Sequence, residues 1–170
     1  MAAEGKLQPL PPNDKKAARE VITAYTLRAE KNERLWHYTQ LRPFRGFGVP
    51  PDQPHANDCS GYDSLVFNWA MHWIKRYIAD PLGFTYDGWG NTSSLFTFLR
   101  DYDAPKDKYL VGDITIYALG TIHAHTTVCR KAGSARTAIF SSNGEESGPE
   151  PESLHYRDDL TGVFRHPQLR

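Results

Sequence analysis

The chain has 170 residues, of which 39% are hydrophobic, and its 20 basic residues balance its 20 acidic ones. This composition is typical of one globular domain, and the zero net charge argues against a general nucleic-acid binder. Two cysteines are too few for a disulfide scaffold, so we expect free thiols. No segment approaches the ~20 apolar residues that span a bilayer, so we expect no membrane insertion.

The N-terminal region is polar and lacks the apolar core of a secretory signal. Residues 1–12 are rich in proline, and we expect them to form a flexible arm ahead of a single domain over residues 13–170. Residues 13–32 predict a helix capped by Asn13 or Asp14, because apolar side chains recur along one stripe. That stripe consists of Ala18, Val21, Tyr25 and Ala29.

A long loop is predicted over residues 34–58, which are dense in glycine, proline and aromatic residues. Loops of this length inside a compact domain often carry function. The clearest helix follows, capped by Asp58 or Asn57 and ended by Pro81 at about Asp80. Its apolar residues recur at steps of three and four, and they are Tyr62, Leu65, Val66, Trp69, Ala70, Trp73, Ile74 and Tyr77.

The C-terminal half changes from helical periodicity to alternation. Residues 83–92 predict an aromatic, glycine-rich loop, and residues 93–103 predict a short helix. Strands are then expected wherever the apolar period is two. The expected strands cover 109–119, 123–132, 136–143, 154–159 and 161–167, with a hairpin turn at 131–136 and a loop at 144–153. Helices followed by an antiparallel sheet indicate an α+β fold.

Cys59 lies in the first turn of the buried helix. Unpaired backbone N–H groups and the positive helix end favour a thiolate at this position. Gly61 allows a backbone or a substrate to approach closely. The alternative is a small buried core residue, because free cysteine is often buried.

A thiol nucleophile needs a base, and His123 and His125 are the candidates. Two residues apart on one predicted strand, they share a face at ~7 Å, so alternation alone does not choose between them. Asn143 at the end of the next strand could orient the base. The alternatives are surface or core histidines, and a turn residue before Gly144.

The same two histidines also suggest a zinc site, because two imidazoles on one face fit a metal. A third ligand would come from Asp58, Asp113 or His155.

Two stretches resemble the NlpC-type papain-like cysteine peptidases. NDCSGYDSLVFNWA resembles their Asp-Cys-Ser-Gly element, and VGDITIYALGTIHAHTTVCRKAG resembles their Gly-Asp strand followed by the strand with the catalytic histidine. The flanking segments HYTQLRPFRG, AIFSSNGEESGPEP and YRDDLTGVFRH look like the peptidase domains of lysins from phages of actinobacteria. The resemblance extends from about residue 30 to the C-terminus, and it implies a papain-like fold.

The resemblance implies a catalytic set of Cys59 as nucleophile, His125 as base and Asn143, with Ser142 in reserve, as the polar third member. Tyr38 matches a family tyrosine that assists the oxyanion hole and the substrate. In some members, the positions of Asp58 and Ser60 hold the free amine of the stem peptide, and an arginine shortly precedes the aspartate. At that place this sequence has PHAN, without an arginine.

The implied function is that of an endolysin-like hydrolase, which cleaves an amide bond in the stem peptide or cross-bridge of peptidoglycan. No metal or other cofactor is implied, and we expect a monomer with peptidoglycan as its partner. Without a signal peptide, the protein would be made in the host cytoplasm and reach the cell wall through a separate pore-forming protein. The alternatives are a zinc-dependent amidase using His123 and His125, and a non-catalytic wall-binding module.

Overall fold

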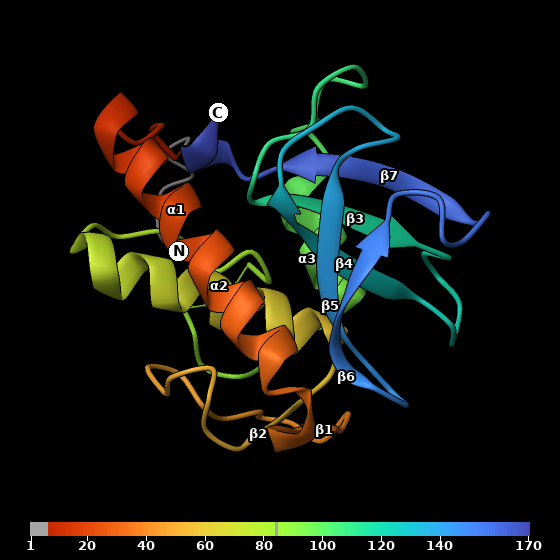
Figure 1. Ribbon diagram of the computed structural model, residues 1–170. Helices are drawn as coiled ribbons and strands as arrows, with labels where there is room; N and C mark the ends of the chain where they lie inside the picture. The colour runs from red at the N-terminus through yellow and green to blue at the C-terminus, as the bar shows by residue number, and fades with distance from the viewer. Residues whose placement is uncertain (1–6, 84) are drawn as a thin grey trace.

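Two long helices pack on one face of a five-stranded antiparallel sheet in the computed structural model, which describes residues 7–83 and 85–170 (Figure 1). The strand order is β6-β5-β4-β3-β7. The helices are α1 (Pro12–Lys31), α2 (Cys59–Ile74) and α3 (Thr92–Leu99), with single turns η1 (Glu33–Leu35) and η2 (Pro167–Leu169). The sheet strands are β3 (Asp113–Tyr117), β4 (His125–Lys131), β5 (Ile139–Gly144), β6 (Gly148–Ser153) and β7 (Leu160–Arg165). This architecture confirms the mixed α and β layout with an antiparallel sheet.

The helix α2 begins where its sequence predicts, because the Asp58 side chain accepts a hydrogen bond from the Gly61 N–H at 2.8 Å. It ends earlier than predicted, since Lys75 adopts a left-handed conformation with φ of 54°. The predicted end near Asp80 is therefore wrong. Trp73, counted on the apolar stripe, is 63% exposed at the end of the helix.

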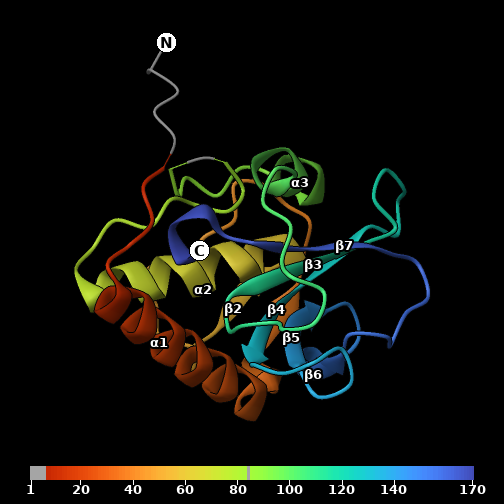
Figure 2. The ribbon, with the colours of Figure 1, turned by 90° about the horizontal axis from the view of Figure 1, so that it is seen from above.

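The helix α1 starts at Pro12, ahead of both predicted caps, Asn13 and Asp14, and no side chain caps it, so the predicted cap is wrong. Proline suits this first position because its fixed φ is already helical and its missing N–H needs no partner. Of the expected N-terminal arm, residues 1–6 lie outside the described part of the chain. Leu10 is buried, and its N–H donates to the Gln168 carbonyl at 2.8 Å. Seen from above, α1 and α2 lie side by side with the C-terminus close to both (Figure 2).

The two faces of the sheet have different surroundings. One face contributes Ile114, Ile116 and Val128 to the main core beneath α1 and α2. Residues on the opposite face form a second, smaller apolar cluster, which includes Cys129 and Phe140. Side-chain alternation therefore decides which of these two environments each strand residue enters.

Three predictions about the elements need correction. Residues 144–153 were predicted as a loop, but β6 occupies most of them and pairs with β5 over six residues. Residues 154–159 were predicted as a strand and form a turn instead. The predicted loop over 34–58 contains a short parallel pair, β1 (Trp36–Tyr38) with β2 (His55–Asn57). Proline-rich β6 is an edge strand, where a missing N–H costs no ladder bond.

The predicted short helix is confirmed as α3, although it ends at Leu99. Its cap is Asn91, whose side chain accepts hydrogen bonds from Ser93 and Ser94. No helix in the described part of the chain is long and apolar enough to cross a membrane.

Candidate active site

Cys59 is the first residue of α2, and its side chain faces a cleft of about 470 Å³. The thiol is buried, with 3% of the residue exposed. The cleft is lined by Tyr38 at the end of β1 and by loop residues that include Arg42 and Trp89. The helix capping geometry therefore places the cysteine at the positive end of α2, as the sequence predicted.

Asp58 next to the cysteine is held by three hydrogen bonds. Its Oδ1 accepts from the Gly61 N–H and from Ser60 Oγ at 2.9 Å. Its Oδ2 accepts from Arg42 Nη2 at 2.5 Å in an ion pair that is largely buried. The PHAN segment has no arginine, but Arg42, 16 residues upstream, pairs with Asp58.

Nothing in the sequence spacing connects Arg42 with Asp58. The contact depends on how the long loop folds. Arg42 Nε also donates to the Gly90 carbonyl at 2.8 Å, and the Phe44 N–H donates to the Gly88 carbonyl at 2.9 Å. Two loops that are distant in the sequence therefore hold the guanidinium against Asp58, the residue before Cys59.

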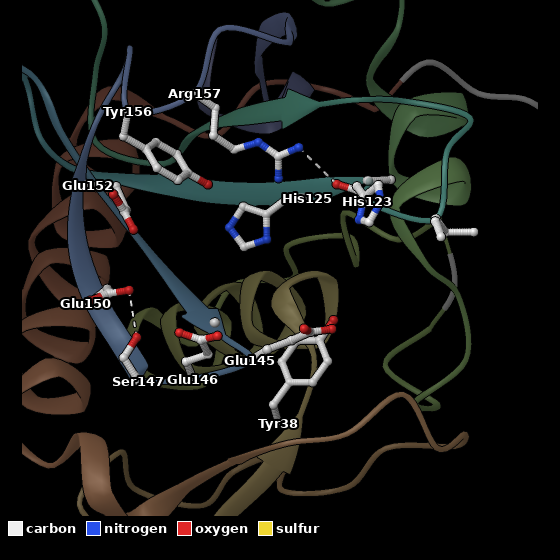
Figure 3. Close-up of a pocket in the computed structure, with 13 residues that line it drawn as sticks. Tyr38, His123, His125, Glu145, Glu146, Ser147, Glu150, Glu152, Tyr156 and Arg157 are labelled. Carbon is white, nitrogen blue, oxygen red and sulfur yellow. Dashed lines mark hydrogen bonds between the residues drawn. The ribbon is translucent and has the colours of Figure 1, made fainter.

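His125 begins β4 and points into a second cleft, of about 500 Å³ (Figure 3). Tyr117, its cross-strand partner on β3, lies beside the ring with centroids 6.4 Å apart. Tyr156 meets the ring edge to face at 6.1 Å. Figure 3 shows the imidazole between Tyr38 on one side and Tyr156 and Arg157 on the other.

The two clefts adjoin, because Tyr38, Ile122 and Ala124 line both. Cys59 lines one cleft and His125 lines the other. No hydrogen bond joins these two side chains among the described contacts. The fold thus brings Cys59 and His125, the predicted nucleophile and base, to two clefts that share part of their lining.

The surroundings of both groups favour their neutral forms. Burial, and next the charge of Asp58, raises the pKa of the Cys59 thiol to about 12, although the Thr126 N–H favours the thiolate. Burial, and next the charge of Arg157, lowers the pKa of His125 to about 4. This environment therefore favours a thiol at Cys59 and a neutral imidazole at His125. A neutral imidazole is the form that can act as a general base.

His123 does not share the strand with His125, because β4 starts at His125. It lies in the preceding turn, where it is exposed and its carbonyl accepts from Arg157 Nη2 at 3.1 Å. The prediction that both histidines lie on one strand face is therefore wrong. The described residues contain no group of three metal-ligating side chains close enough to hold an ion.

Asn143 faces the helices rather than His125. It is fully buried, and its Nδ2 donates to the Asn57 carbonyl at 2.8 Å. It shares this sheet face with Ser141, whose hydroxyl bonds Tyr62 of α2. The predicted hydrogen bond from Asn143 to the base is absent from the described contacts, and the amide instead holds the residue before Asp58.

Ser142, the reserve candidate, lies on the His125 face by alternation. Its hydroxyl donates to the Thr126 carbonyl at 2.7 Å. Tyr38, from β1, is half-buried and its hydroxyl accepts from Gln40 Nε2 at 3.3 Å. Burial raises the pKa of Tyr38, so it is a neutral donor facing both clefts.

Sequence reasoning missed Arg42, Tyr156 and Arg157. Tyr156 and Arg157 lie in a segment that was interpreted as a strand, so their convergence on His125 was not visible. The available sequence signal for a turn here was an arginine and an aspartate two residues apart. In the structure, Arg157 Nε donates to Asp159 Oδ1 at 2.8 Å across this turn.

No protein-family model matches this chain, and no curated protein shows significant similarity to it.

Proposed function

We propose that this protein is a cysteine-dependent amide hydrolase of papain-like fold that acts on peptidoglycan. The observation that carries the proposal is the placement of Cys59 and His125 on adjoining clefts that share Tyr38. A buried thiol at a helix N-terminus and a neutral imidazole on the adjoining cleft supply the nucleophile and the base that this catalysis needs. The wall substrate is inferred from the resemblance to phage lysins.

In the proposed reaction, His125 removes the proton from Cys59 as the sulfur attacks the amide carbonyl carbon. The backbone N–H of Cys59 and the Tyr38 hydroxyl stabilise the oxyanion that forms. His125 returns the proton to the leaving nitrogen as the carbon–nitrogen bond breaks. Water, deprotonated by the same imidazole, then hydrolyses the thioester and regenerates the thiol.

Asp58 and Ser60 are the proposed contacts for the stem peptide. The Asp58 carboxylate is already paired with Arg42. An amine bound there would share the carboxylate with the guanidinium, and Trp89 across the cleft supplies an exposed apolar wall.

Digestion of purified actinobacterial cell walls tests this function. Wild type should release new amino groups, and Cys59→Ala should release none. Cys129→Ala is the matched control, because Cys129 is also buried but lies in the second apolar cluster away from both clefts. Mass spectrometry of the fragments would identify the bond. Equal activity of Cys59→Ala and wild type would refute the mechanism.

The two alternatives make different predictions in the same assay. A zinc amidase would lose activity with a chelator, regain it with zinc, and tolerate iodoacetamide. A wall-binding module would sediment with walls without releasing amino groups.

A further inference from the structure

The His125 ring has no hydrogen-bond partner among the residues that the structure describes. A catalytic imidazole normally needs a third group that fixes its orientation and stabilises its charged form. Asn143 is engaged by Asn57 on the opposite sheet face. A different group must therefore orient the His125 ring.

Two hydroxyls that the neighbouring strands present on the His125 face, those of Tyr117 and Ser142, already donate to backbone carbonyls. On β3, the Tyr117 hydroxyl donates to the Leu154 carbonyl at 2.8 Å and is fixed there. On β5, Gly144 continues the alternation of Ser142 on the His125 face but carries no side chain. The Ser142 hydroxyl hydrogen is committed to the Thr126 carbonyl. Both hydroxyls are therefore directed toward other groups, and the remaining aromatic hydroxyl beside the His125 ring is that of Tyr156.

Tyr156 lies outside the strands that flank β4, and its ring packs against His125. It lies in the turn between β6 and β7, and its ring packs edge to face against both His125, at 6.1 Å, and Tyr117, at 5.2 Å. Its hydroxyl is buried and makes no well-directed hydrogen bond in the described part of the chain, although the Arg157 guanidinium is its charged neighbour. Tyr156 lines the same cleft as His125 (Figure 3). A buried hydroxyl without a partner costs stability, so its retention needs an explanation.

We propose that Tyr156 is the positioning residue of His125, and that its hydroxyl oxygen accepts a hydrogen bond from the imidazolium N–H. The bond forms when His125 has taken the proton from Cys59, and it loosens when that proton passes to the leaving amine. The Tyr156 hydroxyl itself transfers no proton. Catalytic hydrogen bonds that are open in a resting site commonly close as the reaction proceeds. The catalytic use of this bond depends on the proposed function, but its formation with a protonated His125 does not.

Other charges also act on the imidazole and are common to every variant tested. Arg157 disfavours the imidazolium, whereas Asp58 and Asp159 favour it. The remaining titratable groups that line this cleft are Tyr38, His123, Glu145, Glu146, Glu150 and Glu152.

An NMR titration of the ring protons of His125 tests the proposal without any substrate. The His125→Ala variant identifies the signal. If Tyr156 accepts a hydrogen bond from the imidazolium, His125 should titrate about one pH unit lower in Tyr156→Phe than in wild type. The reason is that the charged ring loses its acceptor in the variant. An unchanged midpoint in Tyr156→Phe would overturn the proposal.

Tyr117→Phe is the matched control, since it removes a hydroxyl from the same aromatic group. Because that hydroxyl bonds Leu154, its loss should lower the melting temperature and leave the His125 midpoint in place. Tyr156→Phe should show the reverse, with an unchanged or higher melting temperature. Equal midpoint shifts in both variants would indicate a general packing effect and would contradict the proposal.

Wall digestion adds the catalytic readout. Tyr156→Phe should lower kcat about 10- to 100-fold with little change in KM, in the range of general acid–base effects. If wild type digests no wall, the proposed function fails while the NMR comparison still decides the role of Tyr156. If wild type digests walls and Tyr156→Phe matches it in midpoint and kcat, only the role of Tyr156 fails.

Discussion

Arg42 lies against Asp58 in an ion pair whose two side chains are 14% and 10% exposed, immediately before the candidate nucleophile. The pair connects the loop after β1 to the N-terminus of α2. Since Asp58 also caps the helix through Gly61, the guanidinium and the helix start share one carboxylate. Loss of either interaction should therefore disturb the position of Cys59.

Replacing Arg42 with methionine should lower the free energy of unfolding by about 1–3 kcal/mol, because a largely buried carboxylate loses its partner. Urea unfolding measures this loss. Arg28→Met is the control, since Arg28 pairs with Asp52 at the exposed surface. That variant should unfold like wild type. Equal stability losses in the two variants would show that Arg42 acts only as a surface charge.

Gly88 supports the same loop from the other side. Its φ is +83°, and a Cβ added there would lie 2.1 Å from the Phe44 carbonyl oxygen. Gly88→Ala should therefore cost about 2–4 kcal/mol in unfolding free energy and impair wall digestion through Arg42. Gly48→Ala shares the positive φ but meets nothing within 4 Å. It should cost only about 1 kcal/mol of backbone strain, so equal losses would contradict the role given to the Phe44 contact.

The sequence was sufficient to place Cys59, because helix periodicity and a capping aspartate are local signals. It also predicted the antiparallel strands, because the period-two pattern of side chains is present in β3, β4 and β5. It did not predict the end of α2, where Lys75 adopts a left-handed conformation. Glycine or asparagine usually marks such a position, and neither occurs there. Proline-rich β6 was missed because edge strands tolerate proline.

The site was harder to predict than the fold, because its contacts join distant loops. Asn143 was assigned from its strand, but a shift of one residue along a strand reverses the face. Its neighbour Ser142 therefore shares the His125 side, while Asn143 reaches Asn57. Arg42 was missed because its contact with Asp58 depends on a loop without periodicity.

Alkylation of Cys59 should accelerate steadily with pH. Burial raises the pKa of this thiol to about 12, so the thiolate fraction rises about tenfold per pH unit between pH 6 and 9. Iodoacetamide labelling followed by peptide mapping would measure the rate, with buried Cys129 in the same protein as an internal reference. A rate that is constant from about pH 5 upward would instead indicate a resting thiolate–imidazolium pair.

Asp63 should make the protein less stable as pH rises. The Thr126 hydroxyl oxygen lies 2.7 Å from both the Asp63 carboxyl and the Thr115 carbonyl. Its single hydrogen can serve only one of them, so a protonated Asp63 donating to Thr126 satisfies both contacts. This agrees with burial raising the pKa of Asp63 well above its usual value.

Because the folded state then holds a proton that the unfolded state loses near pH 4, stability should fall as pH rises above about 4. Asp63→Asn keeps the shape, cannot ionise, and can donate from its amide to Thr126. Its unfolding free energy should therefore vary less between pH 5 and pH 8, and its advantage over wild type should be larger at pH 8. Urea unfolding of both proteins at the two pH values gives the comparison. Parallel pH profiles would mean that Asp63 is ionised in the folded protein.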